Sequence, residues 1–232
     1  MRKNGTDQAE PWSEDRYGDV EVLTWNLDEV KVPDSVIRSY LPAGEVEAVG
    51  RTRNPGLRRR RLLSRSLLRA VLAGRTGTPA PLLGFRRGPL GKPYLTTGPA
   101  FNTAHSGAFL MVALRPNGRV GVDLEAIRPS ADLLHVAERY FAAKEWEEIQ
   151  SEGPNAVRTF FRTWVRKEAF LKAMGAGLSL PLHSFTVSAR VAPPGLNVLQ
   201  HVNAPGESTE LWNVCSISAP DGTEAALAWD SP

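Results

Sequence analysis

The feature that most constrains the fold is an order of segments that occurs twice, before and after residues 116–118. In each half, short apolar segments with the alternation of strands accompany one long segment with helical spacing. The strands cluster in runs instead of alternating singly with helices, which favours the α+β class. We therefore expect two similar subdomains in one chain, each a small, mostly antiparallel sheet packed on a long helix. No identity between the halves is visible by inspection, so the duplication is an expectation about structure alone.

The individual elements follow from periodicity and from glycine or proline stop signals. We expect helices at residues 57–73 with a stop at Gly74, at 131–142, from 143 onward, and at 156–174 with stops at Gly175 and Gly177. We expect strands at residues 20–25, 107–114, 119–127, 185–191, 211–218 and 225–229. Asn117-Gly118, flanked by apolar runs, predicts a hairpin between the second and third of these strands.

Composition sets the broad class of protein and the organisation of the chain. The 232 residues are 42% hydrophobic and 23% charged, which is typical of a globular protein. We expect a flexible tail at residues 1–18, an N-terminal subdomain at 19–117 and a C-terminal subdomain at 118–232. No apolar run predicts a membrane helix or a secretory signal. The single cysteine, Cys215, cannot form an internal disulfide, which suits a reducing cytoplasm.

Positive charge is concentrated in one segment of a chain whose net charge is only +3. Eight arginines fall between Arg51 and Arg69, with no acid among them. Those at the start of the expected helix oppose its dipole, which slightly favours a functional reason for their presence. The run predicts an anionic partner, such as a phosphate, a nucleic acid or an acidic protein, although a solvated helix face is the commoner explanation.

Two carboxylates stand two residues apart on an expected strand. The period of a strand places Asp123 and Glu125 on one face, with Val122 and Leu124 on the other. Carboxylates this close repel each other unless a cation lies between them, and hard oxygen ligands suit Mg²⁺. The alternative is a solvent-facing strand that carries two acids without a function.

Two further segments carry residues that could take part in catalysis or binding, but each segment is ambiguous alone. On the expected helix 156–174, the side chains of Trp164, Glu168 and Lys172 are spaced by four and share one face. Glu168 and Lys172 could form an ordinary surface ion pair, which contributes little to stability. Upstream, His105 follows Asn102 by three residues just before a strand, where a lone histidine is more often structural than catalytic.

Taken in order, the three segments resemble one family. Asn-x-x-His-Ser-Gly from Asn102, Gly-x-Asp-x-Glu from Gly121, and Trp-x-x-Lys-Glu-Ala-x-x-Lys-x-x-Gly from Trp164 resemble the 4′-phosphopantetheinyl transferase superfamily. The spacing is similar to the monomeric Sfp-type branch, in which both halves of the fold lie in one chain. The resemblance covers residues 58–187. It implies an active site between the subdomains, with the 3′-phosphate of coenzyme A on the N-terminal side and the acidic metal-binding residues on the C-terminal side.

The resemblance also implies roles for individual residues. Asp123, Glu125 and Glu168 match the metal-binding carboxylates, and Asp123, Glu168 and Lys172 match the catalytic set. The residues that match coenzyme A contacts are Arg60, Arg87, Lys92 (in Gly91-Lys92-Pro93), Asn102, His105, Asp123, Glu168 and Lys172. Whether Glu168 is a metal ligand or the base that removes the serine proton stays open.

The chain departs from the family pattern in two places. The family often has serine immediately before the histidine, and this chain has Ala104, so a hydroxyl contact to phosphate is expected to be lost there. Thr103 could replace that contact, but the sequence does not decide this. An upstream basic pair seen in some relatives has no clear counterpart, and Arg51 and Arg53 are no more than candidates for it.

The implied reaction is transfer of the phosphopantetheine arm of coenzyme A to a serine of an acyl or peptidyl carrier protein. The implied cofactor is Mg²⁺, with Mn²⁺ as an alternative, and the release of 3′,5′-ADP is expected. The partners would be coenzyme A and an acidic apo carrier protein, with no nucleic acid and no membrane, for a cytoplasmic monomer. Three alternatives remain: a nucleic-acid-binding module built on the arginine helix, another Mg²⁺-dependent phosphotransferase or nuclease, and an inactive relative.

Overall fold

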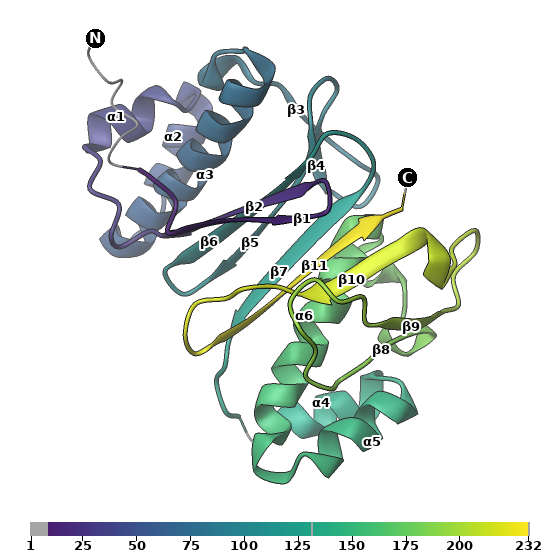
Figure 1. Cartoon of the computed structure of the whole chain (residues 1–232). Helices are drawn as coiled ribbons and strands as arrows, with labels where there is room; N and C mark the ends of the chain where they lie inside the picture. The colour runs from purple at the N-terminus through teal and green to yellow at the C-terminus, as the bar shows by residue number, and fades with distance from the viewer. Residues whose placement is uncertain (1–8, 131, 232) are drawn as a thin grey trace.

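The N-terminal half is built on a four-stranded antiparallel sheet with one long helix on its outer face (Figure 1). The computed structural model describes residues 9–130 and 132–231. The strand order is β1 (Ser13–Tyr17), β2 (Val20–Asn26), β6 (Phe109–Arg115), β5 (Ala100–Ser106). The long helix is α3 (Pro55–Thr76), and its leucines pack with Leu23, Trp25 and Leu110 in one apolar core.

The C-terminal half repeats this plan with three antiparallel strands. Its sheet has the order β10 (Trp212–Ser216), β11 (Thr223–Asp230), β7 (Val120–Ala126). The long helix α6 (Ala156–Met174) packs on the outer face of this sheet, with Phe170 and Leu171 in the core. The predicted α+β class, with two sheets each packed on a long helix, is confirmed.

The remaining elements show that the duplication extends through the whole fold. From β2 in the first half and from β7 in the second, one strand is followed by two short helices, the long helix, a small two-stranded sheet and the last two strands, with β1 as an addition before β2. The short helices are α1 (Asp34–Ser39) and α2 (Ala43–Gly50) in the first half, and α4 (Leu133–Tyr140) and α5 (Ala143–Ser151) in the second. The small sheets pair β3 (Phe85–Arg87) with β4 (Pro93–Leu95), and β8 (Phe185–Val187) with β9 (Leu199–Val202).

Once the halves are aligned by structure, related sequence also becomes visible at a spacing of one hundred residues. Pro-Leu-Leu-Gly-Phe at 81–85 matches Pro-Leu-His-Ser-Phe at 181–185. Tyr40 and Glu45 likewise match Tyr140 and Glu145. The duplication therefore extends from the structure to the sequence. The matches are short and separated, and inspection without the structural alignment does not reveal them.

An ion pair occurs at the same place in both halves, half-buried in the first and fully buried in the second. Glu45 of α2 pairs with Arg69 of α3, and Glu145 of α5 pairs with Lys167 of α6 at 2.8 Å. Each cation also donates to two backbone carbonyls after its helix: Ala80 and Leu83 for Arg69, and Leu182 and Phe185 for Lys167. Each lies over a phenylalanine ring, Phe85 or Phe185. Since the paired charges satisfy each other, they fasten each long helix to its surroundings.

The ends of the long helices follow from local sequence. Asn54 caps α3 by accepting from the Leu57 backbone N–H at 2.9 Å, and Pro55 occupies the first helical position. The predicted stop at Gly74 was wrong, because α3 continues to Gly77, whose φ of +70° ends it. The predicted range of α6 and its end at Gly175, with φ of +69°, are confirmed.

Three other predictions about the elements need correction. The tail predicted for residues 1–18 lies partly outside the described residues, and its part from Ser13 to Tyr17 forms β1, which pairs with β2. The hairpin predicted at Asn117-Gly118 was wrong, because β6 and β7 belong to different sheets. Since β2 and β5 already occupy both edges of β6, no edge remains for β7. The predicted set of elements was also incomplete, because it lacked α1, α2, β3, β4, β5 and β9.

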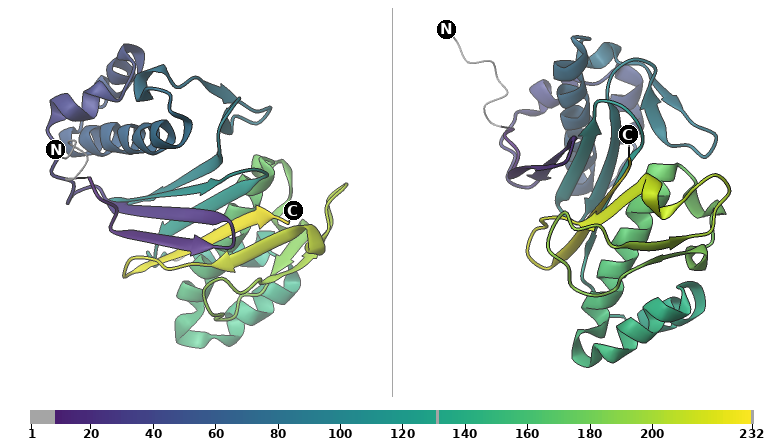
Figure 2. Two further views of the ribbon diagram at one scale, coloured as in Figure 1. Left: turned by 45° about the horizontal axis from the view of Figure 1, so that its top comes forward. Right: turned by 45° about the vertical axis from the view of Figure 1, so that its right-hand side comes forward.

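The two sheets meet across a shared core, with the long helices outside them (Figures 1 and 2). Val20 and Val22 of β2 pack there with Val122 and Leu124 of β7 and with Cys215. Cys215 is a fully buried core side chain, and burial raises the pKa of its thiol to about 12. In the described part of the chain, no helix combines the length and the apolar character needed to cross a membrane.

Candidate active site

The site is built where β7 of the second half lies beside β5 of the first. The backbone groups of Arg119 and Ile127 form hydrogen bonds toward β11. Because backbone groups alternate in direction along a strand, the even-numbered residues of β7 direct their N–H and C=O groups the other way, toward β5. Side chains satisfy these groups instead of a backbone ladder. The Val122 N–H donates to Asn102 Oδ1 at 3.0 Å, and the Ala126 N–H donates to Ser106 Oγ at 2.8 Å. The equal steps along both strands show that β5 and β7 run parallel.

Asp123 and Lys172 form the central contact of the site. Lys172 Nζ donates to Asp123 Oδ1 at 2.6 Å and to the Val122 carbonyl at 3.2 Å. Asp123 is 5% exposed, and its Oδ2 is buried without a partner among the described residues. Burial raises the pKa of Asp123 although the Lys172 ammonium opposes the shift. One carboxylate oxygen therefore stays available to a ligand.

The other two predicted carboxylates lie within electrostatic range of Asp123. Glu125 Oε2 accepts from Ser106 Oγ at 3.1 Å. Burial raises the pKa of Glu125, and the charge of Asp123 raises it further. Burial also raises the pKa of Glu168, with Asp123 and Glu125 both contributing and Lys172 opposing. The structure thus brings together Asp123, Glu125, Glu168 and Lys172, as the sequence predicts.

The donor set of the cluster fits a hard cation. Three carboxylates supply oxygen ligands, their charges repel one another, and one buried oxygen of Asp123 has no partner within the described residues. No three His, Cys, Asp or Glu side chains of the described chain stand in metal-binding geometry, and Lys172 is the cation beside Asp123. The metal roles of Asp123, Glu125 and Glu168 stay predictions.

Gly121 is a functional residue that the sequence analysis did not explain. A Cβ at this position would lie 2.1 Å from the Ala169 carbonyl oxygen and 2.3 Å from the Ala173 backbone nitrogen. The backbone of α6 therefore packs directly on β7 here, which places Glu168 and Lys172 over the strand that carries Asp123. A glycine inside a strand is a recognised signal of such close approach, so the sequence contained this clue.

A basic hollow adjoins the acidic cluster on the side of α3. Its volume is about 490 Å³. Its polar lining includes Arg60, Arg61, Ser64, Arg65 and His105. His105 lines this hollow with an exposed side chain; desolvation lowers its pKa, and repulsion by Lys172 of the cluster lowers it further. The arrangement joins positive charge from one half to carboxylates from the other.

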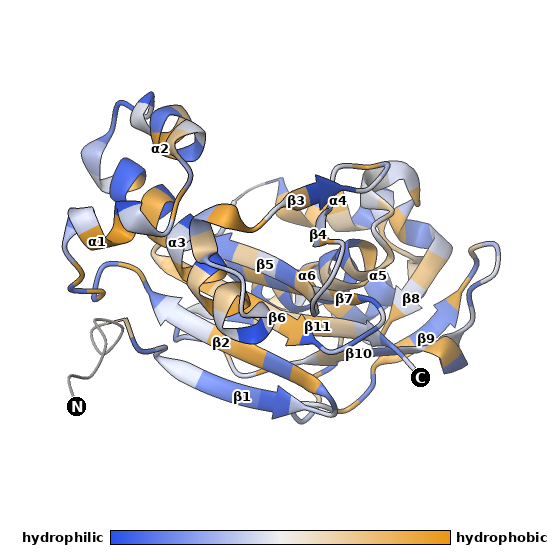
Figure 3. Cartoon of the chain, turned by 90° about the horizontal axis from the view of Figure 1, so that it is seen from above, coloured by the Kyte–Doolittle hydropathy of each residue, from blue (hydrophilic) through white to orange (hydrophobic). Residues whose placement is uncertain are grey.

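Two predicted coenzyme A contacts lie in or near positive surfaces but already have partners. Arg60 forms two hydrogen bonds with Asp28, from Nε at 2.8 Å and from Nη2 at 2.5 Å. The pKa of Asp28 falls because of this pairing. Arg87 lies on the hydrophilic strand β3 (Figure 3) and donates to the Gly91 carbonyl at 2.9 Å. Their contacts with coenzyme A stay predictions.

Lys92 and Asn102 point inward, toward β7. Lys92 Nζ donates to three backbone carbonyls, and burial, with repulsion from Arg119, lowers its pKa to about 8 against the opposing effect of Asp230. Asn102 is buried and accepts from Val122 as described above. The structure shows both side chains joining the halves, and their predicted contacts with coenzyme A stay predictions.

The direction of the Ala104 side chain explains why this position has no hydroxyl group. Ala104 is 2% exposed and packs in the shared core between the sheets, with Val22 and Met111. A hydroxyl at this position would point into that core, away from the face that carries His105. Thr103 shares the face of His105 and is only partly buried, so it is the better placed of the two to reach a ligand.

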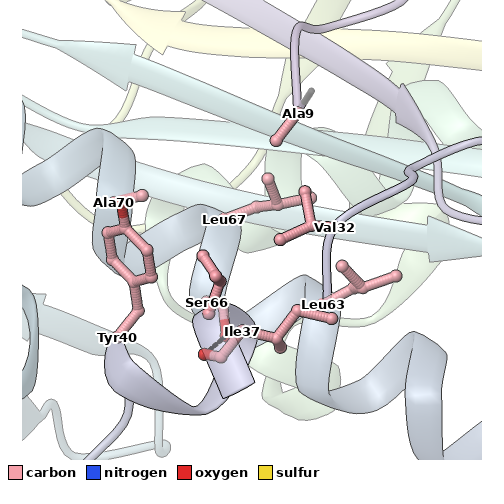
Figure 4. Close-up of a pocket in the computed structure, with 9 residues that line it drawn as sticks. Ala9, Val32, Ile37, Tyr40, Leu63, Ser66, Leu67 and Ala70 are labelled. Carbon is pink, nitrogen blue, oxygen red and sulfur yellow. Dashed lines mark hydrogen bonds between the residues drawn. The ribbon is translucent and has the colours of Figure 1, made fainter. Parts of the chain in front are cut away.

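A second hollow lies apart from this site. It is enclosed by apolar side chains of α1 and α3, including Ile37, Leu63 and Leu67, and has a volume of only about 40 Å³ (Figure 4). Ser66 Oγ donates to the Ile37 carbonyl at 2.7 Å, which leaves the lining without an unsatisfied polar group there. Nothing in this hollow suggests chemistry.

Comparison with known proteins identifies the family. Residues 119–218 match the family model of the 4′-phosphopantetheinyl transferase superfamily. The chain is 37% identical over 203 residues to slr0495 of Synechocystis, which its name assigns to the 4′-phosphopantetheinyl transferases, with 83% of this chain and 80% of the relative covered. It is 29% identical over 216 residues to 4′-phosphopantetheinyl transferase HetI of Nostoc, with 90% and 87% covered.

The matched part includes the second half of the site. The chain is also 32% identical over 131 residues to 4′-phosphopantetheinyl transferase Sfp of Bacillus subtilis, with 55% of this chain and 57% of Sfp covered. Asp123, Glu125, Glu168 and Lys172 all lie within the range of the family model. The chain therefore belongs to the 4′-phosphopantetheinyl transferase superfamily and is a transferase of that class.

Proposed function

We propose that this enzyme transfers the 4′-phosphopantetheine group of coenzyme A to a serine of an apo acyl or peptidyl carrier protein, with Mg²⁺ as cofactor. The observation that carries the proposal is the junction of two surfaces of opposite charge. The acidic cluster suits a metal that binds a pyrophosphate, and the adjoining basic hollow suits a distant phosphate. The family shown by the relatives supports the same reaction.

In this reaction the serine oxygen attacks the β-phosphorus of coenzyme A, and the bond from that phosphorus to the bridging oxygen breaks. The products are the phosphopantetheinyl serine and 3′,5′-ADP. Asp123 and Glu125, with Glu168 as a third candidate, would hold Mg²⁺, which when bound neutralises charge on the pyrophosphate. Lys172 supplies a positive charge beside Asp123 for the departing phosphate.

Glu168 can also serve as the base for the serine proton. Its pKa is raised, which brings it closer to the pH at which a base is most efficient. No described residue donates a hydrogen bond to its carboxylate. The roles of ligand and base both remain compatible with this position. His105 and the arginines of the hollow anchor the 3′-phosphate, which supplies binding energy away from the reacting atoms.

Mass spectrometry of an apo carrier protein tests the proposal directly. The enzyme is mixed with the carrier, coenzyme A and Mg²⁺, and the carrier is expected to gain one phosphopantetheine on serine. A chelator should stop the gain, and Mg²⁺ or Mn²⁺ added in excess should restore it. An unmodified set of fatty-acid, polyketide and peptide carriers under these conditions would rule out the proposal.

Glu168→Gln is expected to raise the melting temperature in a chelator by about 2–4 °C, the shift that ~1 kcal/mol gives a chain of this size. Ionised Glu168 opposes folding at neutral pH because burial and two neighbouring carboxylates raise its pKa. The neutral amide removes that penalty. Added Mg²⁺ should then raise the melting temperature of the wild type more than that of the variant.

Calorimetry or a dye-based melting assay measures both shifts. Glu147→Gln, at an exposed position of α5, is the matched control and should leave the melting temperature and the Mg²⁺ response unchanged. A Glu168→Gln variant that melts below the wild type in chelator would contradict the repulsion described here. An equal Mg²⁺ response in both proteins would remove Glu168 from the metal site.

The carrier KM is expected to rise severalfold when NaCl is raised from about 50 to about 300 mM, since salt screens attraction between exposed charges. Arg51 and Arg53, which are exposed just before α3, would attract an acidic carrier. Arg53→Gln should weaken this salt dependence and leave kcat unchanged. Steady-state kinetics with varied carrier decides the matter, and a KM independent of salt would exclude electrostatic steering.

A further inference from the structure

The surroundings of Lys92 differ from those of a lysine whose ammonium is free to bind a phosphate. It lies in the loop between β3 and β4, in the N-terminal half. Its Nζ donates to the carbonyl oxygens of Lys172 at 2.6 Å, Val120 at 2.7 Å and Ala173 at 3.2 Å. An ammonium group has three N–H donors, so these carbonyls use all of them. All three acceptors belong to the C-terminal half.

The acceptors lie on the two elements that carry the acidic cluster. The Val120 carbonyl belongs to the edge of β7 that faces β5. The carbonyls of Lys172 and Ala173 are among the last four of α6, which lack the N–H donor that the next turn supplies inside a helix, although the Lys172 carbonyl also accepts from the Gly175 N–H at 3.3 Å. A positive charge at the end of a helix also complements the helix dipole. The stem of Lys92 passes beside Gly175, where an added Cβ would lie 3.7 Å from Lys92 Cδ.

Lys172 is consequently held at both ends. Its carbonyl accepts from Lys92, and its ammonium donates to Asp123 and to the Val122 carbonyl. Any rotation or lift of the last turn of α6 would move this ammonium away from Asp123. Glu168 lies one turn earlier on the same face of α6, so it would move as well.

We propose that Lys92 is a positioning residue, which fastens the end of α6 to β7 so that Lys172 and Glu168 face Asp123 and Glu125. The inference rests on the proposed function for its kinetic consequence, and it gives the Lys92 ammonium a task other than binding coenzyme A. The N-terminal half thereby sets the geometry of carboxylates that it does not itself carry.

Kinetics separate positioning from ligand binding. A lysine that contacts coenzyme A would raise its Kd and KM when removed, whereas a positioning lysine affects kcat. Lys92→Met keeps the length of the stem and removes the donors. It is expected to lower kcat by about 10-fold to 100-fold, the usual range for groups that orient a site. The Kd of coenzyme A, measured by calorimetry, should stay within about threefold of the wild type.

Two companion variants sharpen the test. Arg86→Met removes a charge from the same hairpin, on the exposed strand β3, and should leave kcat and Kd unchanged. Lys92→Arg keeps the charge and the donors and should retain most of kcat. If Lys92→Met does not fold, Lys92→Gln replaces it, because an amide keeps two of the three donors.

A double-mutant cycle tests whether Lys92 acts through Lys172. In a Lys172→Met background, Lys92→Met should lower single-turnover rates by less than about twofold, since coupled residues are not additive. Hydrogen exchange gives a readout that needs no activity. The Gly175 and Ala176 amides, which bond to Lys172 and Leu171, should lose protection in Lys92→Met but not in Arg86→Met.

The possible results are distinguishable. A wild type that transfers nothing defeats the proposed function, and hydrogen exchange then still decides whether Lys92 fastens α6. Lower kcat with unchanged Kd, coupling to Lys172 and local loss of protection support the inference. A raised Kd for coenzyme A with normal kcat would overturn it, as would full additivity with Lys172→Met or unchanged exchange at Gly175 and Ala176.

Discussion

Gly121→Ala is expected to lower the free energy of unfolding by about 3 kcal/mol or more, at the upper end of the effects of overpacking. The added Cβ would lie 2.1 Å from the Ala169 carbonyl oxygen and 2.3 Å from the Ala173 nitrogen. Both atoms are helix backbone and cannot rotate away, so α6 must move off β7. Since Glu168 and Lys172 move with it, kcat should fall about 100-fold, as for a displacement of about 1 Å.

Urea denaturation and carrier modification measure the two effects. Gly74→Ala is the matched control, because Gly74 lies within α3 and an added Cβ there meets nothing within 4 Å. That variant should gain about 0.5–1 kcal/mol from the better helix propensity of alanine. If Gly121→Ala keeps both the stability and the kcat of the wild type, close packing of α6 on β7 is not required.

Asp123→Ala is expected to abolish transfer while leaving the fold intact, with kcat reduced by at least about 10²–10³-fold, the effect of removing a single charge-stabilising group. Asp123 is the carboxylate that contacts Lys172 and raises the pKa of both other acids. The fold should survive because burying this carboxylate is itself unfavourable, and Lys172, whose side chain is 31% exposed, can turn to solvent.

Mass spectrometry of the carrier and a melting curve of the enzyme test this expectation. Asp221→Ala, in the exposed turn before β11, is the control and should transfer at the wild-type rate. Near-normal transfer by Asp123→Ala in the presence of Mg²⁺ would remove this residue from the chemistry. A variant that is inactive only because it unfolds would instead make Asp123 a structural residue.

The parts of the fold that depend on local chemistry could be predicted from the sequence. The range of α6 follows from its helical spacing and from Gly175, and the shared face of Asp123 and Glu125 follows from the period of a strand. The association of these acids with Glu168 and Lys172 came from the order of three motifs. Each motif is ambiguous alone, and the structure confirms that their residues lie together.

The parts that depend on contacts between distant segments could not be predicted. Asn117-Gly118 has the local signal of a hairpin, but β2 and β5 pair with the two edges of β6 and leave no edge for β7. The motif assigned Lys92 to the nucleotide, whereas in the structure its ammonium donates to carbonyls at the C-terminal end of α6, eighty residues away. Gly121 within a strand indicates that another backbone approaches closely, but the fold is needed to show that this backbone is α6.

The ion pairs Glu45–Arg69 and Glu145–Lys167 show which features of the repeat are architectural. At the positions of Asp123 and Glu125, the first half has Leu23 and Trp25, which are core side chains. The ion pair is therefore present in both copies, while the carboxylates of the site are present in one. A chain that contains two copies of the same frame can specialise them separately: one copy keeps the reactive acids, and the other is free to turn the same positions into support.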